Sequence, residues 1–229
     1  MPLQSGRRHA RPTLARRVLA LLEREYGRPR HHRRPALDVL IGTILSQNTS
    51  DTNSHRAFRS LKQAFPSWKS VVEARASEIA SAIRCGGLAR IKAPRIRAIL
   101  QQLLRERGKA DLEFIERWPR EKALDYLMVL PGVGAKTASC VLLFAFGKPV
   151  LPVDTHVHRV SQRLGLVGEG VSPEKAQGAL EKIVQPKDRL SFHINLIAHG
   201  RAICRPKPRC SECVLLVLCP HGKKLRGAQ

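Results

Sequence analysis

Residues 121 to 147 constrain the fold most, because two helical patterns meet there across the short segment LPGVG. Gly132 and Gly134 bracket Val133 in a turn so tight that side chains would obstruct the backbone and any chain lying against it. The turn exposes amide N–H groups at the start of the second helix, where unpaired donors and the positive end of the helix dipole suit a phosphate oxygen. The pattern therefore predicts two helices joined by a phosphate-binding turn, with an ordinary helix connection as the alternative.

The composition favours helices throughout the chain. Aromatic residues make up only 4% of the 229 residues, whereas Ala, Leu and Arg are abundant, which suits helices better than sheets. We therefore expect an all-α fold. Apolar periodicity and the placement of Pro and Gly predict a turn at 48–53 and further helices at residues 36–47, 68–74, 76–84, 89–106, 111–117, 155–165, 172–183 and 187–202.

The net charge indicates a polyanionic partner. Lys and Arg number 41 against 18 acidic residues, a formal net charge of +23, and such an excess is typical of nucleic-acid binding. An anionic membrane surface and a merely very soluble protein are the alternatives, although no apolar run approaches the roughly 20 residues of a membrane-spanning helix. The Arg-rich start lacks the apolar core of a signal peptide, so we expect a cytoplasmic protein, with an organellar transit peptide as the alternative.

Four of the six cysteines crowd near the C-terminus in the pattern C-x5-C-x2-C-x5-C, formed by Cys204, Cys210, Cys213 and Cys219. Four thiolates at this spacing can surround a compact metal centre, and the spacing alone leaves zinc and a [4Fe-4S] cluster open. Cys85 and Cys140 are isolated within apolar patterns, and we expect them to be small buried side chains.

The segment LPGVGAKTA at 130–138, followed by VDTH at 153–156, resembles the signature of the endonuclease III branch of the helix-hairpin-helix, Gly/Pro-rich-loop, Asp glycosylases. The resemblance extends from about residue 14 to residue 219. It implies a bifunctional DNA glycosylase and abasic-site lyase of base excision repair, with oxidised pyrimidines as the damaged bases. It also implies that Lys136 is the Schiff-base lysine and Asp154 the catalytic aspartate.

Elementary chemistry makes these two roles reasonable. A lysine attacks carbon only as the free amine, so a catalytic lysine must be desolvated or repelled by positive charge. Lys136 falls in the first turn of the predicted helix, where the positive end of the dipole and apolar packing disfavour an ammonium group. Asp154 can stabilise positive charge that develops on the sugar as the base departs, or cap the helix that follows it, and the two roles can coexist.

The candidate DNA contacts of the hairpin are Leu130, Gly132, Val133 and Gly134, and the resemblance nominates two further segments. Leu88, at the apolar tip of the segment GGLA, matches the wedge that family members insert into DNA, with core burial as the alternative. The segment LSQNTSD matches the part that supplies a polar gap filler. An ungapped match puts Asn48 at the position of the family's glutamine and Gln47 one residue earlier, and helix capping is the alternative role for Asn48.

For the C-terminal cysteines the resemblance selects a [4Fe-4S] cluster, although this chain has one residue fewer between Cys204 and Cys210 than the usual family pattern. We expect two helical domains, one at 29–148 and one made of 13–28 with 149–219, and basic tails at 1–12, disordered, and 220–229. Duplex DNA would bind in the cleft between the domains of a monomeric, nucleoid-associated protein. The rivals are a monofunctional adenine-type glycosylase, which lacks the lysine, and a non-catalytic hairpin scaffold with structural zinc.

Overall fold

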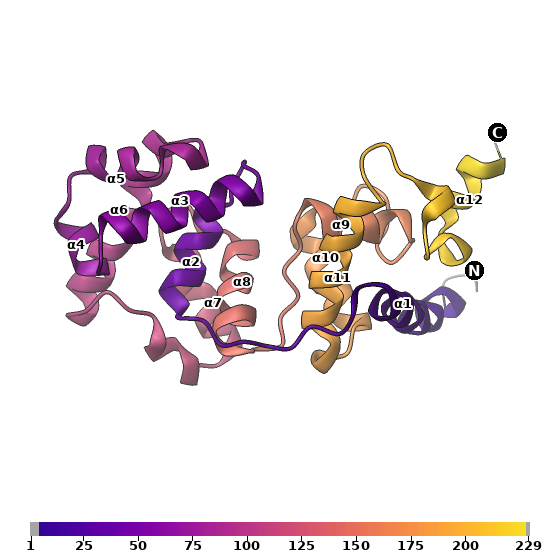
Figure 1. The fold of residues 1–229 in the computed structure, drawn as a ribbon. Coiled ribbons are helices and arrows are strands. Elements are labelled where there is room, and N and C mark those ends of the chain that lie inside the picture. The colour runs from indigo at the N-terminus through magenta and orange to yellow at the C-terminus, as the bar shows by residue number, and fades with distance from the viewer. Residues whose placement is uncertain (1–4, 228–229) are drawn as a thin grey trace. The chain divides into compact units, whose positions relative to one another are not determined.

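The structure is a computed structural model that describes residues 5 to 227, and every regular element in that range is a helix. The helices form two compact units (Figure 1). The central unit comprises residues 32 to 148, and the terminal unit combines the residues up to 31 with those from 149 onward. The predicted all-α class is confirmed. No described helix is both long enough and apolar enough to cross a membrane.

The central unit is built around its most apolar helix, α2 (Ala36–Leu45), in which seven of ten residues are buried. A helix that is apolar on most of its circumference is stable only when other helices surround it, and α2 packs against α3, α6 and α8. The other elements are α3 (Asp51–Ala64), α4 (Trp68–Glu73), α5 (Ala76–Ala82), η1 (Arg84–Gly86), α6 (Ala89–Arg107), η2 (Glu113–Arg117), α7 (Arg120–Val129) and α8 (Ala135–Phe146).

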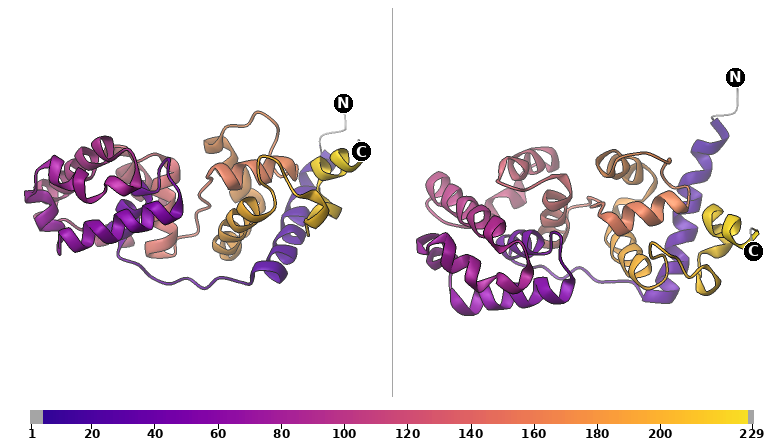
Figure 2. Two further views of the ribbon diagram at one scale, coloured as in Figure 1. Left: turned by 45° about the horizontal axis from the view of Figure 1, so that its top comes forward. Right: turned by 90° about the horizontal axis from the view of Figure 1, so that it is seen from above.

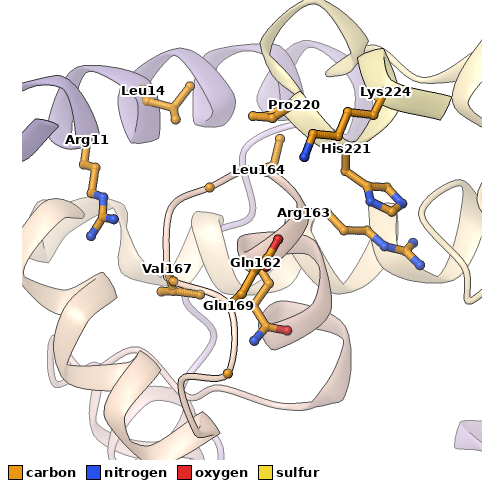
Figure 3. Close-up of a pocket in the computed structure, with 13 residues that line it drawn as sticks. Arg11, Leu14, Gln162, Arg163, Leu164, Val167, Glu169, Pro220, His221 and Lys224 are labelled. Carbon is orange, nitrogen blue, oxygen red and sulfur yellow. The ribbon is translucent and has the colours of Figure 1, made fainter. Parts of the chain in front are cut away.

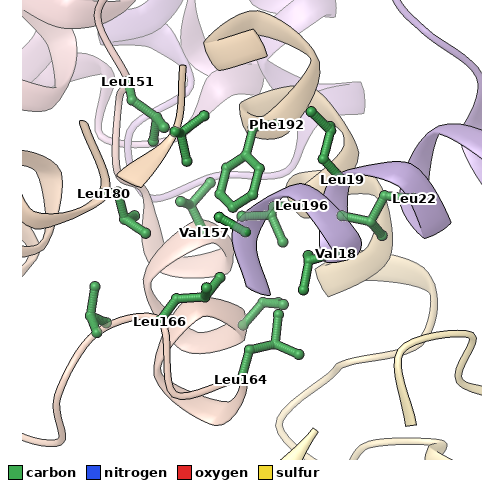
Figure 4. Close-up of a cluster of buried hydrophobic side chains, with 14 of the residues drawn as sticks. Val18, Leu19, Leu22, Leu151, Val157, Leu164, Leu166, Leu180, Phe192 and Leu196 are labelled. Atoms are coloured by element: carbon green, nitrogen blue, oxygen red, sulfur yellow. The ribbon is translucent and has the colours of Figure 1, made fainter. Parts of the chain in front are cut away.

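The terminal unit joins the two ends of the chain in one core. Helix α1 lies beside α11, as the views in Figures 1 and 2 show. Aliphatic side chains from α1, α9, α10 and α11 surround Phe192 in this core (Figure 4). Its elements are α1 (Ser5–Tyr26), α9 (Thr155–Arg163), α10 (Pro173–Ile183), η3 (Pro186–Asp188), α11 (Arg189–Ala202), η4 (Cys210–Glu212), η5 (Leu216–Leu218) and α12 (Pro220–Gly227).

The structure differs from the sequence-based expectation at both ends of the chain. Residues 5 to 12, expected to belong to a disordered tail, form the first turns of α1, and residues 220 to 227, expected to be a tail, form α12. Extending a helix whose later turns are anchored in a core costs far less than nucleating one, and Arg and Ala have high helix propensity. The same expectation for residues 1 to 4 and 228 to 229 falls outside the described residues.

Candidate functional site

The hairpin at 130 to 134 joins α7 to α8 in the central unit. Leu130 and Val133 are only 2% and 5% exposed, and the Val133 N–H closes the turn by donating to the Leu130 carbonyl over 3.1 Å. Gly132 has a φ of +74°, in the left-handed region that favours glycine, and a Cβ added there would lie 2.8 Å from Cδ of Arg95. Leu130 and Val133 therefore anchor the turn in the core and can reach a ligand only through their backbone.

The outer face of the hairpin is open. Gly134 is the N-cap of α8 and supplies no side-chain acceptor, and nothing lies within 4 Å of the place where a Cβ would be added to it. The Arg95 side chain lies against neighbouring Gly132 and brings a cation to the same turn. Unpaired N–H groups, the positive end of the α8 dipole and a nearby guanidinium together suit an anion such as a phosphate.

Lys136 is the second residue of α8, directly after this open turn. Its side chain is half-buried, and the adjacent Thr137 and Ala138 are buried. Within residues 5 to 227, neither a hydrogen bond nor an ion pair engages the Lys136 amine. The amine therefore stands uncommitted at the margin of the core, at a helix end that opposes additional positive charge.

The turn between α2 and α3 places its two polar candidates differently. Gln47 faces the hairpin, because its Nε2 donates to the Gly132 carbonyl over 3.3 Å and lies 3.5 Å from Oγ1 of Thr137. Asn48 is exposed and has a φ of +53°, a conformation that asparagine tolerates better than most residues. Helix α3 is capped by Ser50, so the alternative that Asn48 caps it is wrong.

Leu88 lies at the tip of the loop between η1 and α6. It is 47% exposed, so the alternative of core burial is wrong, and Ile91 beside it is 48% exposed. The φ of Leu88 is +52°, which is strained for a residue with a Cβ. An exposed apolar side chain on a strained backbone is typical of a functional tip rather than of a packing position.

Three segments of the central unit are joined by direct contacts. Gln47 connects the α2–α3 turn to the hairpin, and Arg95 of α6 lies against Gly132 of the same hairpin. Gly86, just before the Leu88 tip, packs so closely on α3 that an added Cβ would lie 2.8 Å from Cβ of Ala57. The candidate DNA-contacting segments are therefore parts of one packed assembly.

Asp154 lies in the terminal unit, where it caps α9. Its Oδ1 accepts from the N–H groups of His156 and Val157 over 2.9 and 2.8 Å, so the predicted capping role is confirmed. Both bonds end on Oδ1, which leaves the cap independent of Oδ2. The half-buried carboxylate is thus held rigidly by one oxygen.

The four C-terminal cysteines line one cavity of the terminal unit, together with Ile203, Pro208 and Leu216. Three of the sulfurs lie within hydrogen-bonding distance of a nitrogen. The contacts are Arg163 Nη1 to Cys204 Sγ at 3.3 Å, Gly222 N–H to Cys219 Sγ at 3.4 Å, and His199 Nε2 to Cys213 Sγ at 3.4 Å. Between residues 5 and 227, no group of three or more His, Cys, Asp or Glu side chains is arranged to hold a metal ion.

Burial governs the titration of the groups around this cavity. It raises the pKa of Cys213 to about 11 and also raises the pKa of Cys219. It lowers the pKa of His199 to about 4, so this imidazole is neutral at physiological pH. A neutral His199 can donate from Nε2 to Cys213 while Nδ1 accepts from the Tyr26 hydroxyl over 3.1 Å. Buried thiols of this kind are structural groups or metal ligands rather than exposed nucleophiles.

A second cavity of the terminal unit, with a volume of about 680 Å³, shares Arg163 and His221 with the cysteine cavity. Helix α1, the end of α9 with the loop that follows it, and helix α12 supply its lining (Figure 3). Arg11 and Lys224 add two cations to Arg163, and Glu169 is the acidic residue of the lining. The hollow is therefore electropositive, in keeping with the net charge of the chain.

The sequence-based reasoning missed two residues of the central unit, Lys92 and Arg95. Lys92 is 2% exposed, and its amine donates to the carbonyls of Leu45 and Gly86. A signal was available, because Lys92 stands in register with the buried Ile96 and Ile99 of α6, on what would otherwise be an apolar stripe. Arg95 gave no such signal, since its contact with the hairpin joins two distant parts of the chain.

Comparison with known proteins shows extensive similarity. Residues 41 to 186 match the family model described as HhH-GPD superfamily base excision DNA repair protein. A putative DNA glycosylase of Arabidopsis thaliana is 41% identical over 189 residues, which are 82% of this chain and 61% of that protein. Endonuclease III of Thermotoga maritima is 38% identical over 199 residues, which are 86% of this chain and 88% of that enzyme.

Solved structures show the same relationship. A non-covalent endonuclease III–DNA complex superimposes with a TM-score of 0.82 and 31% identity, covering 95% of this chain and 99% of that one. A trapped endonuclease III–DNA covalent intermediate gives a TM-score of 0.81, also at 31% identity, and covers 94% and 98% of the two chains.

Proposed function

Because the chain belongs to the HhH-GPD superfamily of base excision DNA repair proteins, we propose that it removes oxidised pyrimidines from duplex DNA through Lys136 and Asp154. Its homologues and structural neighbours indicate a DNA glycosylase and abasic-site lyase. The observation that carries the proposal is the placement of the uncommitted Lys136 amine in the first turn of α8, directly after the open hairpin. Such an enzyme acts wherever the cell keeps its DNA.

The hairpin binds the DNA backbone in this proposal. A phosphate oxygen would accept from the N–H groups at the start of α8, with Arg95 as an additional cation. Contacts of this kind position the duplex without reading its sequence. They hold the damaged strand so that the flipped nucleotide lies within reach of Lys136.

Lys136 is the nucleophile. Its free amine forms a bond to C1′ of the sugar while the bond between C1′ and the base breaks, and the base leaves with that electron pair and takes up a proton. Nζ then gives up a proton to the ring oxygen O4′ as the C1′–O4′ bond breaks, which leaves a protonated imine between Nζ and C1′. This imine withdraws electrons, so a proton can leave C2′ as the bond to the 3′ phosphate breaks. Water finally releases the sugar aldehyde and restores the amine.

Asp154 stabilises the charge that develops in the first of these steps. Positive charge grows on the sugar as the base departs, and a carboxylate fixed in advance stabilises it without reorganising. The two N–H bonds to Oδ1 hold the group in place, and Oδ2 is not used by the cap. The capping role therefore supports the catalytic role instead of competing with it.

Asn48 and Leu88 act on the opened helix. Flipping leaves a gap in the base stack that protein side chains must fill. Asn48 is exposed, whereas the Gln47 amide is bonded to the hairpin, and this difference favours Asn48 as the polar filler. The exposed Leu88, held on a strained backbone, is suited to wedge between bases.

We also propose a [4Fe-4S] cluster as the resident cofactor, held by Cys204, Cys210, Cys213 and Cys219. The four thiols line one cavity together with the apolar side chains of Ile203, Pro208 and Leu216. A zinc ion needs all four sulfurs at about 2.3 Å from one centre, whereas a four-iron cluster takes one thiolate at each of four separate irons. Four thiolates in one cavity can hold either group, and the family resemblance favours the four-iron cluster, which would serve as a cross-link of the C-terminal loop.

The chemistry can be tested by borohydride trapping on a duplex that contains a preformed abasic site. Wild-type protein should form a covalent adduct, because borohydride reduces the imine, and Lys136→Gln should form none. Lys122→Gln is the matched control, since it is the same substitution on an exposed residue of α7 in the same unit. Base release without trapping in the wild type would instead indicate a monofunctional glycosylase, and neither reaction would indicate a non-catalytic scaffold.

A further inference from the structure

Lys92 is a buried lysine of the central unit that the proposed chemistry does not use. We infer that it is a positioning residue, which holds the segments carrying Asn48 and Leu88 in the fixed spacing needed to fill and wedge an opened base stack. This inference rests on the proposed function and deepens it. It assigns a role in base extrusion to a side chain that itself never meets DNA.

The contacts of Lys92 lead to both segments. Its Nζ donates to the carbonyl of Leu45 over 2.7 Å and to that of Gly86 over 3.1 Å. Leu45 is the last residue of α2 and Gly86 is the last residue of η1. A helix end leaves carbonyls without partners and carries negative partial charge, so a cation is suited to bridge two such ends.

The chain leaves these two helix ends directly into the candidate DNA contacts. Asn48 lies three residues beyond Leu45, and Leu88 lies two residues beyond Gly86. The backbone N–H of Lys92 also donates to the Leu88 carbonyl over 2.9 Å. The side chain of Lys92 thus ties the η1 end of the Leu88 loop to the start of the Asn48 turn, while its backbone makes the first hydrogen bond of α6.

Burial of an ammonium group without a carboxylate is costly, so a packing role alone would favour an apolar side chain at this position. Burial lowers the pKa of Lys92, and no charged partner among the described residues opposes that shift. What stabilises the ammonium is the pair of carbonyl dipoles. The desolvation of the Lys92 ammonium is therefore offset by the bonds through which it joins the ends of α2 and η1.

Both segments also need such a restraint. Asn48 and Leu88 are the two non-glycine residues with positive φ among those described, at +53° and +52°. Strained conformations of this kind persist only where surrounding contacts enforce them. Close packing of Gly86 on Ala57 of α3 couples the segments further, so release of one is expected to loosen the other.

Lys92→Met tests the inference, because methionine fills much the same space and donates no hydrogen bond. Amide hydrogen exchange should quicken by about ten-fold or more at Gln47 and Gly87, whose N–H groups are bonded next to the two helix ends, but not at Val133 in the hairpin. Release of the damaged base should fall by about ten-fold, whereas nicking of a preformed abasic site should fall by no more than about two-fold, since less extrusion is needed there. Lys92→Arg, which keeps the donors, should recover both readouts in large part.

Ile99→Val is the matched control, because it loosens a fully buried position that lies about two helical turns beyond Lys92 in α6. It should leave the exchange pattern and the ratio of the two activities unchanged. If Lys92→Met does not fold, Lys92→Gln replaces it. Unchanged exchange at Gln47 and Gly87, or an equal loss of both activities, would overturn the inference. If the wild type neither releases bases nor nicks, the proposed function fails, and the exchange pattern still decides whether Lys92 holds the two loops.

Discussion

Gly132→Ala and Gly134→Ala place the same methyl group on the two glycines of the hairpin, and we expect them to differ sharply in stability. At Gly132 the alanine must keep a φ of +74°, which costs about 1–2 kcal/mol for an L-residue. Its Cβ must also displace the Arg95 side chain, whose Cδ lies 2.8 Å away. Both changes lower the free energy of unfolding of the central unit.

At Gly134 neither cost applies. The φ of −95° is ordinary for alanine, and nothing lies within 4 Å of the added Cβ. Restricting the unfolded chain contributes about 0.4–1 kcal/mol of stability, which the poorer N-cap partly offsets. The net effect of Gly134→Ala on stability should therefore be close to zero.

Tryptophan fluorescence can measure the difference in one unit alone, because both tryptophans, Trp68 and Trp118, lie in the central unit. A gap of about 1–2 kcal/mol between the variants corresponds to roughly 5–10 °C in the thermal midpoint for a unit of this size. Equal midpoints would refute the argument from backbone conformation.

DNA affinity should behave differently from stability. Gly134→Ala puts a methyl group where we propose that a phosphate approaches, so affinity for a duplex with an abasic-site analogue should fall by about ten-fold, or 1.4 kcal/mol. Fluorescence anisotropy at one fixed salt concentration measures this. Wild-type affinity in the stable Gly134→Ala variant would show that the outer face of the hairpin does not contact DNA.

Three further outcomes are expected. Asp154→Asn should preserve folding, because asparagine also caps helices. It should slow base release by a factor of about 100 or more while damaged-DNA affinity stays near wild type. Turnover within a few-fold of wild type would show that Asp154 is only a helix cap. Cys210→Ser should abolish the visible absorbance of the cluster and lower both iron content and soluble yield, whereas a colourless wild type containing zinc would refute the cofactor assignment. Asn48→Gly and Leu88→Gly should leave the thermal midpoint unchanged or higher, since glycine relieves the positive φ, yet reduce base release more than nicking of abasic sites. Gln47→Ala should instead mainly weaken the hairpin contact. An unchanged ratio of base release to nicking in all three variants would remove this region from base extrusion.

The sequence by itself determined the helical class, the positions of most helices and the form of the hairpin. These features depend on local physics: apolar periodicity, helix propensity, and glycines where a turn needs a left-handed residue or an open face. Helix α8 and the turn before it, for example, lie where LPGVG and the following apolar pattern predict them. The approach of the four cysteines to one cavity likewise follows from their short spacing.

Only the tertiary structure decided the roles that depend on distant contacts. Gln47 and Asn48 are adjacent and chemically alike, and they differ because the Gly132 carbonyl, 85 positions further along the chain, binds one of them. The exposure of Leu88 depends on how Gly86 packs against α3, and the burial of Lys92 depends on two helix ends that meet at its amine. Each of these facts joins segments whose proximity exists only after folding, so no local pattern encodes it.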